Sequence, residues 1–382
     1  MIPYGRQAIS QADIDAVIDA LKSDFLTQGP LIEKFERRVA DYCGAQYTVA
    51  VASATAGLHI AYMALGMGPG KTVWTSPNTF VATANAALYC GANIDFVDID
   101  PDTLNMSVQS LRQKLETTDK IPDLVVPVHF AGQSCDMKEI HDLSQHYGFK
   151  VVEDAAHCIG ASYNGRKIGS CEFSAASVYS FHPVKIITTA EGGLVTTNDK
   201  SIYESLLRLR THGITRDPQL MEKKSEGAWY FEQRELGYHY RITDMQCALG
   251  YSQMDRLDEF VARRTFLAAR YNDLLADAPV TIPKIAPNRN SSCHLYAVSL
   301  LPGYDRRDVF DKMRAANIGV NVHYIPVHTQ PYYRDLGFKN NDFPAAENYY
   351  HHALTLPLYP DLSEDEQDYV CQTLMNILGR AR

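Results

Sequence analysis

One lysine in this chain has surroundings that favour covalent chemistry. Lys185 ends the segment Ser180–Lys185, and no other lysine or arginine occurs between Ser170 and Asp199. Most lysines are solvated surface charges, because the ammonium is rarely buried without a reason. The flanks of Lys185 are aromatic, β-branched and small, so we expect a poorly hydrated ammonium with a lowered pKa and a nucleophilic amine. Lys185 is therefore a candidate for holding an aldehyde as a Schiff base.

A turn of small residues could bind an anion. The apolar run Thr48–Ala52 leads into Ser53–Gly57, after which a helix is expected over Leu58–Leu65. Backbone N–H groups at the start of a helix lie at its positive end and are suited to phosphate. Ser and Thr are also common helix caps, so this turn alone is weak evidence for a phosphate site.

An aspartate stands at the end of another apolar run. Asp154 follows Phe149–Val152, at the strand edge where open α/β sheets bind their ligands. It could simply cap the next turn, or it could pair with a protonated ring nitrogen, as pyridoxal phosphate (PLP) requires. PLP also needs a lysine, an anion site and usually an aromatic face. Candidates for all four are present: Lys185, Asp154, Phe80, and the Ser53–Gly57 turn with Ser180. The sequence therefore predicts a PLP site.

The elements that position these residues follow an alternating pattern. Short, near-continuous apolar runs separated by helical segments indicate a buried, mostly parallel α/β sheet. We expect seven strands, at Thr48–Ala52, Thr72–Thr75, Ile94–Val97, Leu124–Val128, Lys150–Val152, Ala175–Phe181 and Leu194–Thr197. We also expect an amphipathic N-terminal helix that starts at Ser10 with Asp13 as its capping-box partner, and a second helix that stops at Gly44.

The C-terminal part of the chain predicts a second, smaller unit. A chain of 382 residues is longer than one ordinary core. We expect a large PLP-binding domain over residues 1–249 and a small α+β domain over residues 250–382. In the small domain we expect a strand at His294–Leu300, a helix at Arg306–Ala316, a strand at Val320–Tyr324 and a helix at Glu364–Leu378.

Composition excludes several classes of function. The chain has 36 basic and 45 acidic side chains, a formal charge of −9, and no basic cluster, which argues against nucleic acid as a partner. The eight cysteines are scattered without a C-x-x-C pair, which argues against a disulfide framework and a metal site. No apolar stretch reaches about 18 residues, so neither membrane spanning nor export is expected. The prediction is a cytoplasmic protein.

With these residues in view, the chain resembles the DegT/DnrJ/StrS family of PLP-dependent sugar-nucleotide aminotransferases, which have the aspartate-aminotransferase (type I PLP) fold. The resemblance spans nearly the whole length, and several ordered motifs are more specific than any single one. The motifs are Thr27–Pro30, Ser53–His59, Thr79–Asn85, Pro127–Gly132, Glu153–His157, the Lys185 segment, Leu236–Gln246 and Leu356–Pro360.

The resemblance implies a role for each matching residue. Lys185 is similar to the lysine that bonds the cofactor, and Asp154 to the partner of its ring nitrogen. The phosphate ligands match Ala54, Thr55 and Ser180, the ring-stacking aromatic matches Phe80, and a residue beside the cofactor matches His157. Members of the family are homodimers in which the loop at Tyr238–Tyr240 reaches the phosphate of the other subunit. That loop often carries Asn, whereas this chain has His239.

The resemblance also suggests a substrate. The segment from Asn321 to Arg334 looks most like that of the transaminases of pseudaminic acid synthesis, which move an amino group, here expected from L-glutamate, to C4 of a UDP-linked 4-keto-6-deoxy-N-acetylhexosamine. Candidate contacts to this UDP-4-keto sugar are His323, Tyr324, His328 and Arg334, although such residue types are often plain surface.

Alternative functions remain open from the sequence. Ser53–Gly57 and Thr189–Glu191 also look like the aminotransferase that acts on a UDP-4-keto-pentose on the way to 4-amino-4-deoxy-L-arabinose. A non-catalytic regulator with the same fold, and PLP-dependent sugar dehydration at C3, are further alternatives. The presence of Lys185 together with Asp154 argues against a regulator, and Lys185 argues against the dehydratase, in which histidine replaces this lysine.

Overall fold

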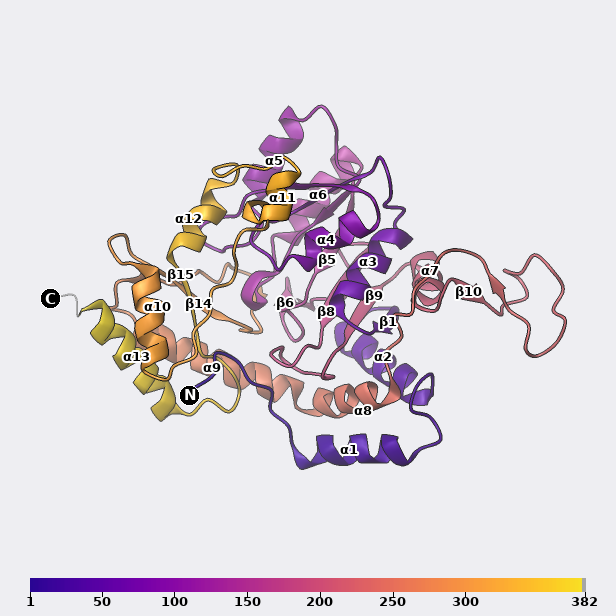
Figure 1. Cartoon of the computed structure of the whole chain (residues 1–382), viewed down its shortest axis with the longest axis horizontal. Helices are drawn as coiled ribbons and strands as arrows, with labels where there is room; N and C mark the ends of the chain where they lie inside the picture. Colours follow the sequence, from indigo (N-terminus) through magenta and orange to yellow (C-terminus); the bar gives the residue numbers. More distant parts are fainter. Residues whose placement is uncertain (380–382) are drawn as a thin grey trace.

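A seven-stranded sheet forms the centre of the molecule. The computed structural model describes residues 1–379 and is drawn in Figure 1. The strands are β1 (Tyr47–Val51), β2 (Thr72–Thr75), β3 (Asn93–Phe96), β4 (Leu124–Val126), β5 (Lys150–Asp154), β8 (Ala176–Ser180) and β9 (Gly193–Thr197). Their order in the sheet is β1-β9-β8-β5-β4-β2-β3. Only β9 runs antiparallel to its neighbours, so the predicted mostly parallel sheet is confirmed.

Helices cover both faces of this sheet (Figure 1). Apolar side chains of α3 (Ala54–Ala64), α4 (Ala82–Tyr89) and α7 (Lys200–Arg210) belong to one core cluster. Those of α2 (Pro30–Cys43), α5 (Val108–Thr117), α6 (Met137–Tyr147) and α8 (Asp244–Gln253) belong to the other. The strands therefore lie between two apolar layers, which explains their near-continuous hydrophobic sequences.

The N-terminal helices begin and end where the sequence indicates. In α1 (Gln11–Lys22) the Ser10 hydroxyl accepts the Asp13 N–H, and the Asp13 carboxylate accepts the Ser10 N–H at 2.8 Å. This reciprocal pair is a capping box. α2 ends at Gly44, whose φ of 76° is the left-handed conformation that glycine adopts without strain.

The C-terminal domain is built on a three-stranded antiparallel sheet. It comprises β12 (Val280–Thr281), β14 (Tyr296–Leu300) and β15 (Ala353–Leu356), in the order β12-β14-β15. The helices around it are α9 (Leu257–Leu274), α10 (Arg306–Ala315), α11 (Pro331–Asp335), α12 (Pro344–His352) and α13 (Glu364–Leu378). The predicted helix at Glu364–Leu378 is present with the predicted bounds.

The expected strand at Val320–Tyr324 is absent. The segment makes one isolated bridge, between Asn321 and Thr355, and then leaves the sheet. The reason is that His323 and Tyr324 turn into a cavity between the domains instead of continuing along β15. The edge of the small sheet is β15 in place of the predicted segment.

One long helix belongs to both domains. Leu257 and Phe260 of α9 pack in the core of the large domain, whereas Leu267 and Tyr271 of the same helix pack in the core of the small domain. The N-terminal end of the chain also reaches the small domain, since Ile2 forms a bridge with Ile318. The change of core therefore falls inside α9, a little after the boundary expected at residue 249.

Short elements complete the fold. A two-stranded ribbon of β10 (Ile214–Thr215) and β11 (Glu232–Gln233) carries a loop that projects from the body of the molecule at the right of Figure 1. A second small sheet joins β6 (Ser162–Tyr163) and β7 (Arg166–Lys167) to β13 (Arg289–Asn290). Three 3₁₀ turns occur at Phe130–Gly132, Met254–Arg256 and Val327–Thr329.

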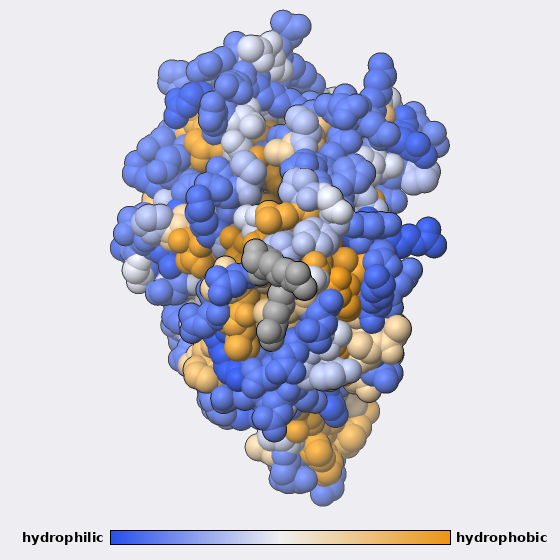
Figure 2. Space-filling view, turned by 90° about the vertical axis from the view of Figure 1, so that its left-hand side faces the viewer, coloured by the Kyte–Doolittle hydropathy of each residue, from blue (hydrophilic) through white to orange (hydrophobic). Residues whose placement is uncertain are grey.

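The surface seen from the small-domain side is largely hydrophilic, with its apolar residues in separate groups (Figure 2). In the described part of the chain, no helix combines the length and apolar character needed to cross a bilayer. All eight cysteines are free thiols, most of them buried.

Candidate active site

A cavity of about 570 Å³ lies between the two domains. The large domain contributes the carboxyl ends of β5 and β8 and the start of α3, while the small domain contributes the segments that hold His294 and Tyr324. Ligand sites in open α/β sheets occur at this edge of the strands. Lys185, Asp154, Ala54, Thr55, Phe80, Ser180, His157, His323 and Tyr324 all line this one cavity.

Lys185 lies in the turn that follows β8. Its backbone N–H donates to the His182 carbonyl at 2.9 Å, which closes the turn. Burial lowers the pKa of Lys185 to about 8, although the nearby carboxylate of Asp154 opposes this shift. About a tenth of its amine is therefore unprotonated at pH 7, far more than for an ordinary lysine, as a nucleophilic lysine requires.

Asp154 is fixed at the end of β5 by two hydrogen bonds. Its Oδ2 accepts from the Thr83 hydroxyl at 2.7 Å, and its Oδ1 accepts from the Ala156 N–H at 3.1 Å. The side chain is 5% exposed. A carboxylate held in this way at the cavity wall is suited to a cationic group of a ligand.

The start of α3 also lines the cavity. The Ser53 hydroxyl accepts the Ala56 N–H at 3.1 Å, so serine is the N-cap and the N–H groups of Ala54 and Thr55 lie in the first turn. Groups in this position have no acceptor within the helix. The turn can approach β9 because residue 193 is glycine: a Cβ there would lie 2.5 Å from the Ala54 nitrogen.

Two further predicted residues line the same cavity. Ser180 is the last residue of β8 and is buried, with its side chain at the cavity wall. Phe80 precedes α4 and is 59% exposed, so its ring lies at the mouth of the cavity. A planar ligand between Phe80 and the sheet would therefore contact an aromatic face.

The small domain closes the cavity with uncharged polar groups. The Tyr324 hydroxyl and His157 Nε2 are 3.1 Å apart, and His323 Nδ1 lies 2.9 Å from the Thr355 hydroxyl. Burial lowers the pKa of His157 well below its usual value and lowers the pKa of His323 to about 3, in both cases assisted by the charge of Lys185. These imidazoles are neutral at pH 7.

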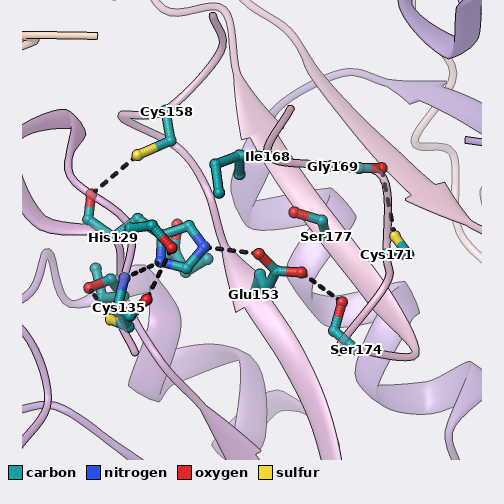
Figure 3. Close-up of polar contacts among 12 residues, drawn as sticks. His129, Cys135, Glu153, Cys158, Ile168, Gly169, Cys171, Ser174 and Ser177 are labelled. Atoms are coloured by element: carbon teal, nitrogen blue, oxygen red, sulfur yellow. Dashed lines mark hydrogen bonds and ion pairs between the residues drawn. The ribbon is translucent and has the colours of Figure 1, made fainter. Parts of the chain in front are cut away.

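A buried network lies on the other side of β5 (Figure 3). Glu153 points away from Asp154, as alternate residues of a strand do. Its carboxylate lies 2.7 Å from His129 Nε2 and accepts the Ser174 hydroxyl at 2.5 Å. Because His129 Nδ1 accepts the Cys135 N–H, the proton is on Nε2 and points at Glu153. This network ties β5 to its surroundings next to Asp154.

The arrangement fits PLP. A lysine with a lowered pKa, a helix start beside a serine hydroxyl, and a buried carboxylate surround one cavity, and an aromatic ring lies at its mouth. These are the groups that the aldehyde, the phosphate, the ring nitrogen and the ring face of PLP require. Nδ1 of His157 is buried and lacks a partner among residues 1–379.

Comparisons with known proteins agree with this geometry. The sequence profile of the DegT/DnrJ/EryC1/StrS aminotransferase family matches residues 7–375. The chain belongs to this family. It is therefore an aminotransferase, and the DegT family uses PLP as its cofactor.

Individual relatives align over the full chain. The spore coat polysaccharide biosynthesis protein SpsC of Bacillus subtilis is 39% identical over 100% of this chain and 98% of its own length. The UDP-4-amino-4,6-dideoxy-N-acetyl-beta-L-altrosamine transaminase of Campylobacter jejuni is 36% identical, over 100% and 99%. The PLP-form structure of the putative sugar aminotransferase Spr1654 from Streptococcus pneumoniae superposes with a TM-score of 0.89 at 29% identity, covering 98% of each chain.

Two of the predicted substrate residues lie away from the cavity in this DegT-family chain. His328 is fully buried; its Nε2 lies 3.0 Å from the Glu347 carboxylate and its ring packs against Phe343. Arg334 is on the exposed side of α11. The structure thus gives His328 a structural role in the core and brings neither residue to the cavity of its own chain. His239 is also exposed and does not line this cavity.

Sequence reasoning missed three residues that shape the site. Thr83 holds Asp154, Glu153 holds His129, and His294 contacts Lys185. Thr83 and Glu153 stand inside motifs that carry the family resemblance, so the motifs themselves were a signal. For His294 the sequence contained no such signal, because the residue is separated from Lys185 by 109 residues and only the fold brings the two together.

Proposed function

We propose that this aminotransferase moves an amino group from L-glutamate to C4 of a UDP-linked 4-keto-6-deoxy-N-acetylhexosamine, in the pathway to pseudaminic acid. The convergence of Lys185, Asp154 and the Ala54–Thr55 turn on one cavity carries the chemical part of the proposal. The substrate part is supported by the segment around His323 and Tyr324 and by the full-length similarity to the altrosamine transaminase.

In this proposal each part of the cofactor has its own protein contacts. Ala54, Thr55 and Ser180 would hold the phosphate, Phe80 would cover one face of the ring, and Asp154 would hold the protonated ring nitrogen. When bound, PLP supplies an electron sink for negative charge that develops on a substrate carbon. The Thr83 hydroxyl and the Ala156 N–H keep the Asp154 carboxylate aimed at its partner, so that its charge needs no reorientation during the reaction.

Lys185 is the proposed general acid and base. Its amine, with a pKa of about 8, can accept a proton at Nζ from the α carbon of the amino donor and would pass it to the aldehyde carbon of the cofactor in the same half-reaction. In the second half Nζ would move a proton in the opposite direction, to C4 of the sugar. The contact between the Tyr324 hydroxyl and His157 Nε2 fixes the orientation of the His157 ring at the cavity wall. Product 2-oxoglutarate leaves before the sugar binds, so ping-pong kinetics are expected.

We also propose a homodimer with shared active sites. Among the described residues that line the cavity, Lys185 is the sole lysine or arginine, yet a UDP-sugar brings a diphosphate that needs positive partners. His239 is exposed close to the projecting ribbon and is available to a second copy. Co-expression of Lys185→Ala and His239→Ala chains tests this, because a shared site leaves one intact active site in each mixed dimer. Recovery of activity is expected; a monomer, or no recovery, contradicts it.

The deciding experiment uses a panel of substrates. The purified enzyme is incubated with L-glutamate and UDP-4-keto sugars that include a hexosamine and a pentose, and each product is identified by mass and NMR. Amination of the 4-keto-6-deoxy-N-acetylhexosamine at C4 is expected. Exclusive use of the pentose would replace this substrate by the precursor of 4-amino-4-deoxy-L-arabinose.

A single substitution tests the role of the lysine. Lys185→Ala is expected to abolish turnover and to remove the absorbance of covalently held cofactor, because no other amine lines the cavity in the described part of the chain. Lys200→Ala, on an exposed side chain that pairs with Glu204, is the matched control and should keep both. Survival of turnover and absorbance in Lys185→Ala would overturn the proposal.

A further inference from the structure

His294 touches the reacting atom of the proposed cofactor lysine. Within residues 1–379, the one side-chain hydrogen bond of the Lys185 amine joins its Nζ to His294 Nε2, at 3.5 Å. His294 lies just before β14 in the small domain and is 4% exposed. Its ring also stands 4.4 Å from the ring of His157, measured between centroids. His294 thus lies beside His157 in the wall of the cavity.

The backbone around His294 is fixed from two sides. On one side its N–H donates to the Ala131 carbonyl at 2.9 Å, and the adjacent Gly132 lets the chain approach closely. A Cβ on Gly132 would lie 2.9 Å from the His294 nitrogen. On the other side the fully buried Arg264 of α9 donates to the His294 carbonyl at 3.3 Å and to the Leu358 carbonyl at 2.9 Å. The imidazole is therefore presented from a rigid support.

His294 is a neutral hydrogen-bond partner for Lys185. Burial, followed by the charge of Lys185, lowers the pKa of His294 well below its usual value. A neutral ring can accept a hydrogen bond from an ammonium or donate one to an amine. Its Nδ1 is buried without a partner in the described part of the protein, so the hydrogen-bonding capacity of the ring is directed at Lys185 through Nε2.

We propose that His294 is a positioning residue for the reaction, which holds the free amine of Lys185 in the cavity whenever that amine is not bonded to the cofactor. A lysine side chain has many rotamers. An amine that samples several of them would have to return to the reactive position before each proton transfer. A hydrogen bond to a fixed imidazole limits this motion. The inference rests on the proposed role of Lys185 and is independent of the sugar.

The test measures the protonation of Lys185 directly. The other titratable groups that face its amine are Asp154 and Cys158 from the β5 side, His157 beside them, and His323 from the small domain. In the full-length chain freed of cofactor, the rate of reductive methylation of Lys185 by formaldehyde and cyanoborohydride is followed against pH by peptide mass spectrometry. In the wild type, the half-maximal rate is expected near pH 8.

Two substitutions of His294 separate a hydrogen bond from simple packing. His294→Phe keeps a planar ring but removes the acceptor for the ammonium, so the pH of half-maximal rate should fall by about 1 unit. His294→Gln places an amide oxygen where Nε2 stood and should restore the wild-type midpoint to within about 0.3 units. The exposed-surface change His351→Phe is the control and should leave the midpoint unchanged.

The outcomes either support or overturn the proposal. An unchanged midpoint in His294→Phe, or a Gln variant that behaves like Phe, overturns it. If the Phe variant does not fold, the ¹⁵N shift of His294 Nε2 is compared between the wild type and Lys185→Met; a changed shift supports contact with the lysine and an unchanged one overturns it. No sugar is used, so failure of the proposed substrate leaves these results valid. Failure of the Lys185→Ala experiment above would instead remove the proposed function.

Discussion

The two walls of the cavity are built from different kinds of structure. The large-domain wall carries Asp154 and Lys185 at or just beyond the ends of regular strands, within the sequence motifs from which both residues were predicted. The small-domain wall carries His294, His323 and Tyr324 on irregular segments, whose positions depend on contacts with distant parts of the chain. The position of a side chain at a regular sheet edge can be inferred from the local sequence pattern. The position of a side chain on an irregular segment depends on the residues that contact the segment in the tertiary structure.

The walls also differ in charge. On the large-domain side a carboxylate and an amine face the cavity, and each has its pKa or its geometry controlled by the neighbours. On the small-domain side the pKa of each histidine is lowered by burial, so this wall is polar but uncharged at pH 7. We infer that the first wall performs the chemistry and the second positions groups within it. Four substitutions examine this division.

The largest effect is expected on the large-domain wall. Asp154→Asn keeps the shape of the side chain but removes the charge that faces the proposed ring nitrogen. Loss of one preorganised electrostatic contact of this kind costs roughly 10³-fold in rate. The measurement is the rate of the absorbance change on mixing the enzyme with glutamate. Asp119→Asn, on the exposed surface, is the control. A loss smaller than tenfold in Asp154→Asn would contradict the assignment.

The junction of the two walls should be sensitive to one added methyl group. Gly132 and Gly148 both have positive φ, of 104° and 83°, but a Cβ at Gly132 would meet Ser292 Oγ at 2.8 Å whereas nothing lies within 4 Å of one at Gly148. Gly148→Ala should therefore cost only the backbone strain, about 1 kcal/mol. Gly132→Ala should cost a further 1–3 kcal/mol in the free energy of unfolding from overpacking.

Urea unfolding of the two cofactor-free variants measures this difference. Gly132→Ala is also expected to lower activity, because Ser292–His294 must move, while Gly148→Ala should not. Equal stabilities for the two variants would show that the small-domain wall tolerates displacement, and would weaken the idea that it is a rigid support.

The neutral histidines should make the protein sensitive to acid. The pKa of His323 is lowered to about 3 in the folded state, against about 6.5 when unfolded, so the unfolded chain binds the extra proton. Its contribution to stability is complete above about pH 6.5 and is lost as the pH falls below that, by about 1.4 kcal/mol per pH unit. His323→Gln should reduce the pH dependence of unfolding by this amount between pH 5 and 6.

The free energy of unfolding is measured by urea titration at several pH values in wild type and His323→Gln. A replacement of an exposed histidine, His351→Gln, should leave the slope unchanged. The same slope in His323→Gln as in wild type would mean that this histidine is protonated in the folded protein, and the wall would then be charged.

The smallest effect is expected for a hydroxyl on the small-domain wall. Tyr324→Phe removes the hydrogen-bond partner of His157 Nε2. One such hydrogen bond contributes about 1 kcal/mol, so we expect about a fivefold loss in kcat/KM. Tyr349→Phe removes a buried hydroxyl that has no partner in residues 1–379 and should cost neither activity nor stability. Equal kinetics for the two variants would mean that Tyr324 does not position His157.

Much of the large domain could be predicted because its signals are local. Most strands of the central sheet are short, largely apolar runs, and the capping box at Ser10 and the glycine at residue 44 mark helix ends by their own chemistry. The small domain was predicted less well. Val320–Tyr324 has the composition of a strand, but it makes only one bridge, because its side chains turn into the cavity.

Residue types alone did not separate binding from packing. His323 and His328 are five residues apart and equally suited to phosphate, but the first lines the cavity and the second is paired with Glu347 in the core. Phe96 and Phe343 pack against the ring of His328, and this core environment could be seen only in the tertiary structure. His294 is the converse case, since its contact with Lys185 depends on Arg264 and Gly132, which lie far from it in the chain.

The fold class, the aminotransferase family and the PLP-type chemistry could be predicted from the sequence, because they depend on local patterns and on ordered motifs around Lys185 and Asp154. The tertiary structure decided which groups meet the lysine amine. Contacts between segments more than 100 residues apart place His294 beside it, and burial in the interdomain cavity lowers the pKa of His294 and of His323.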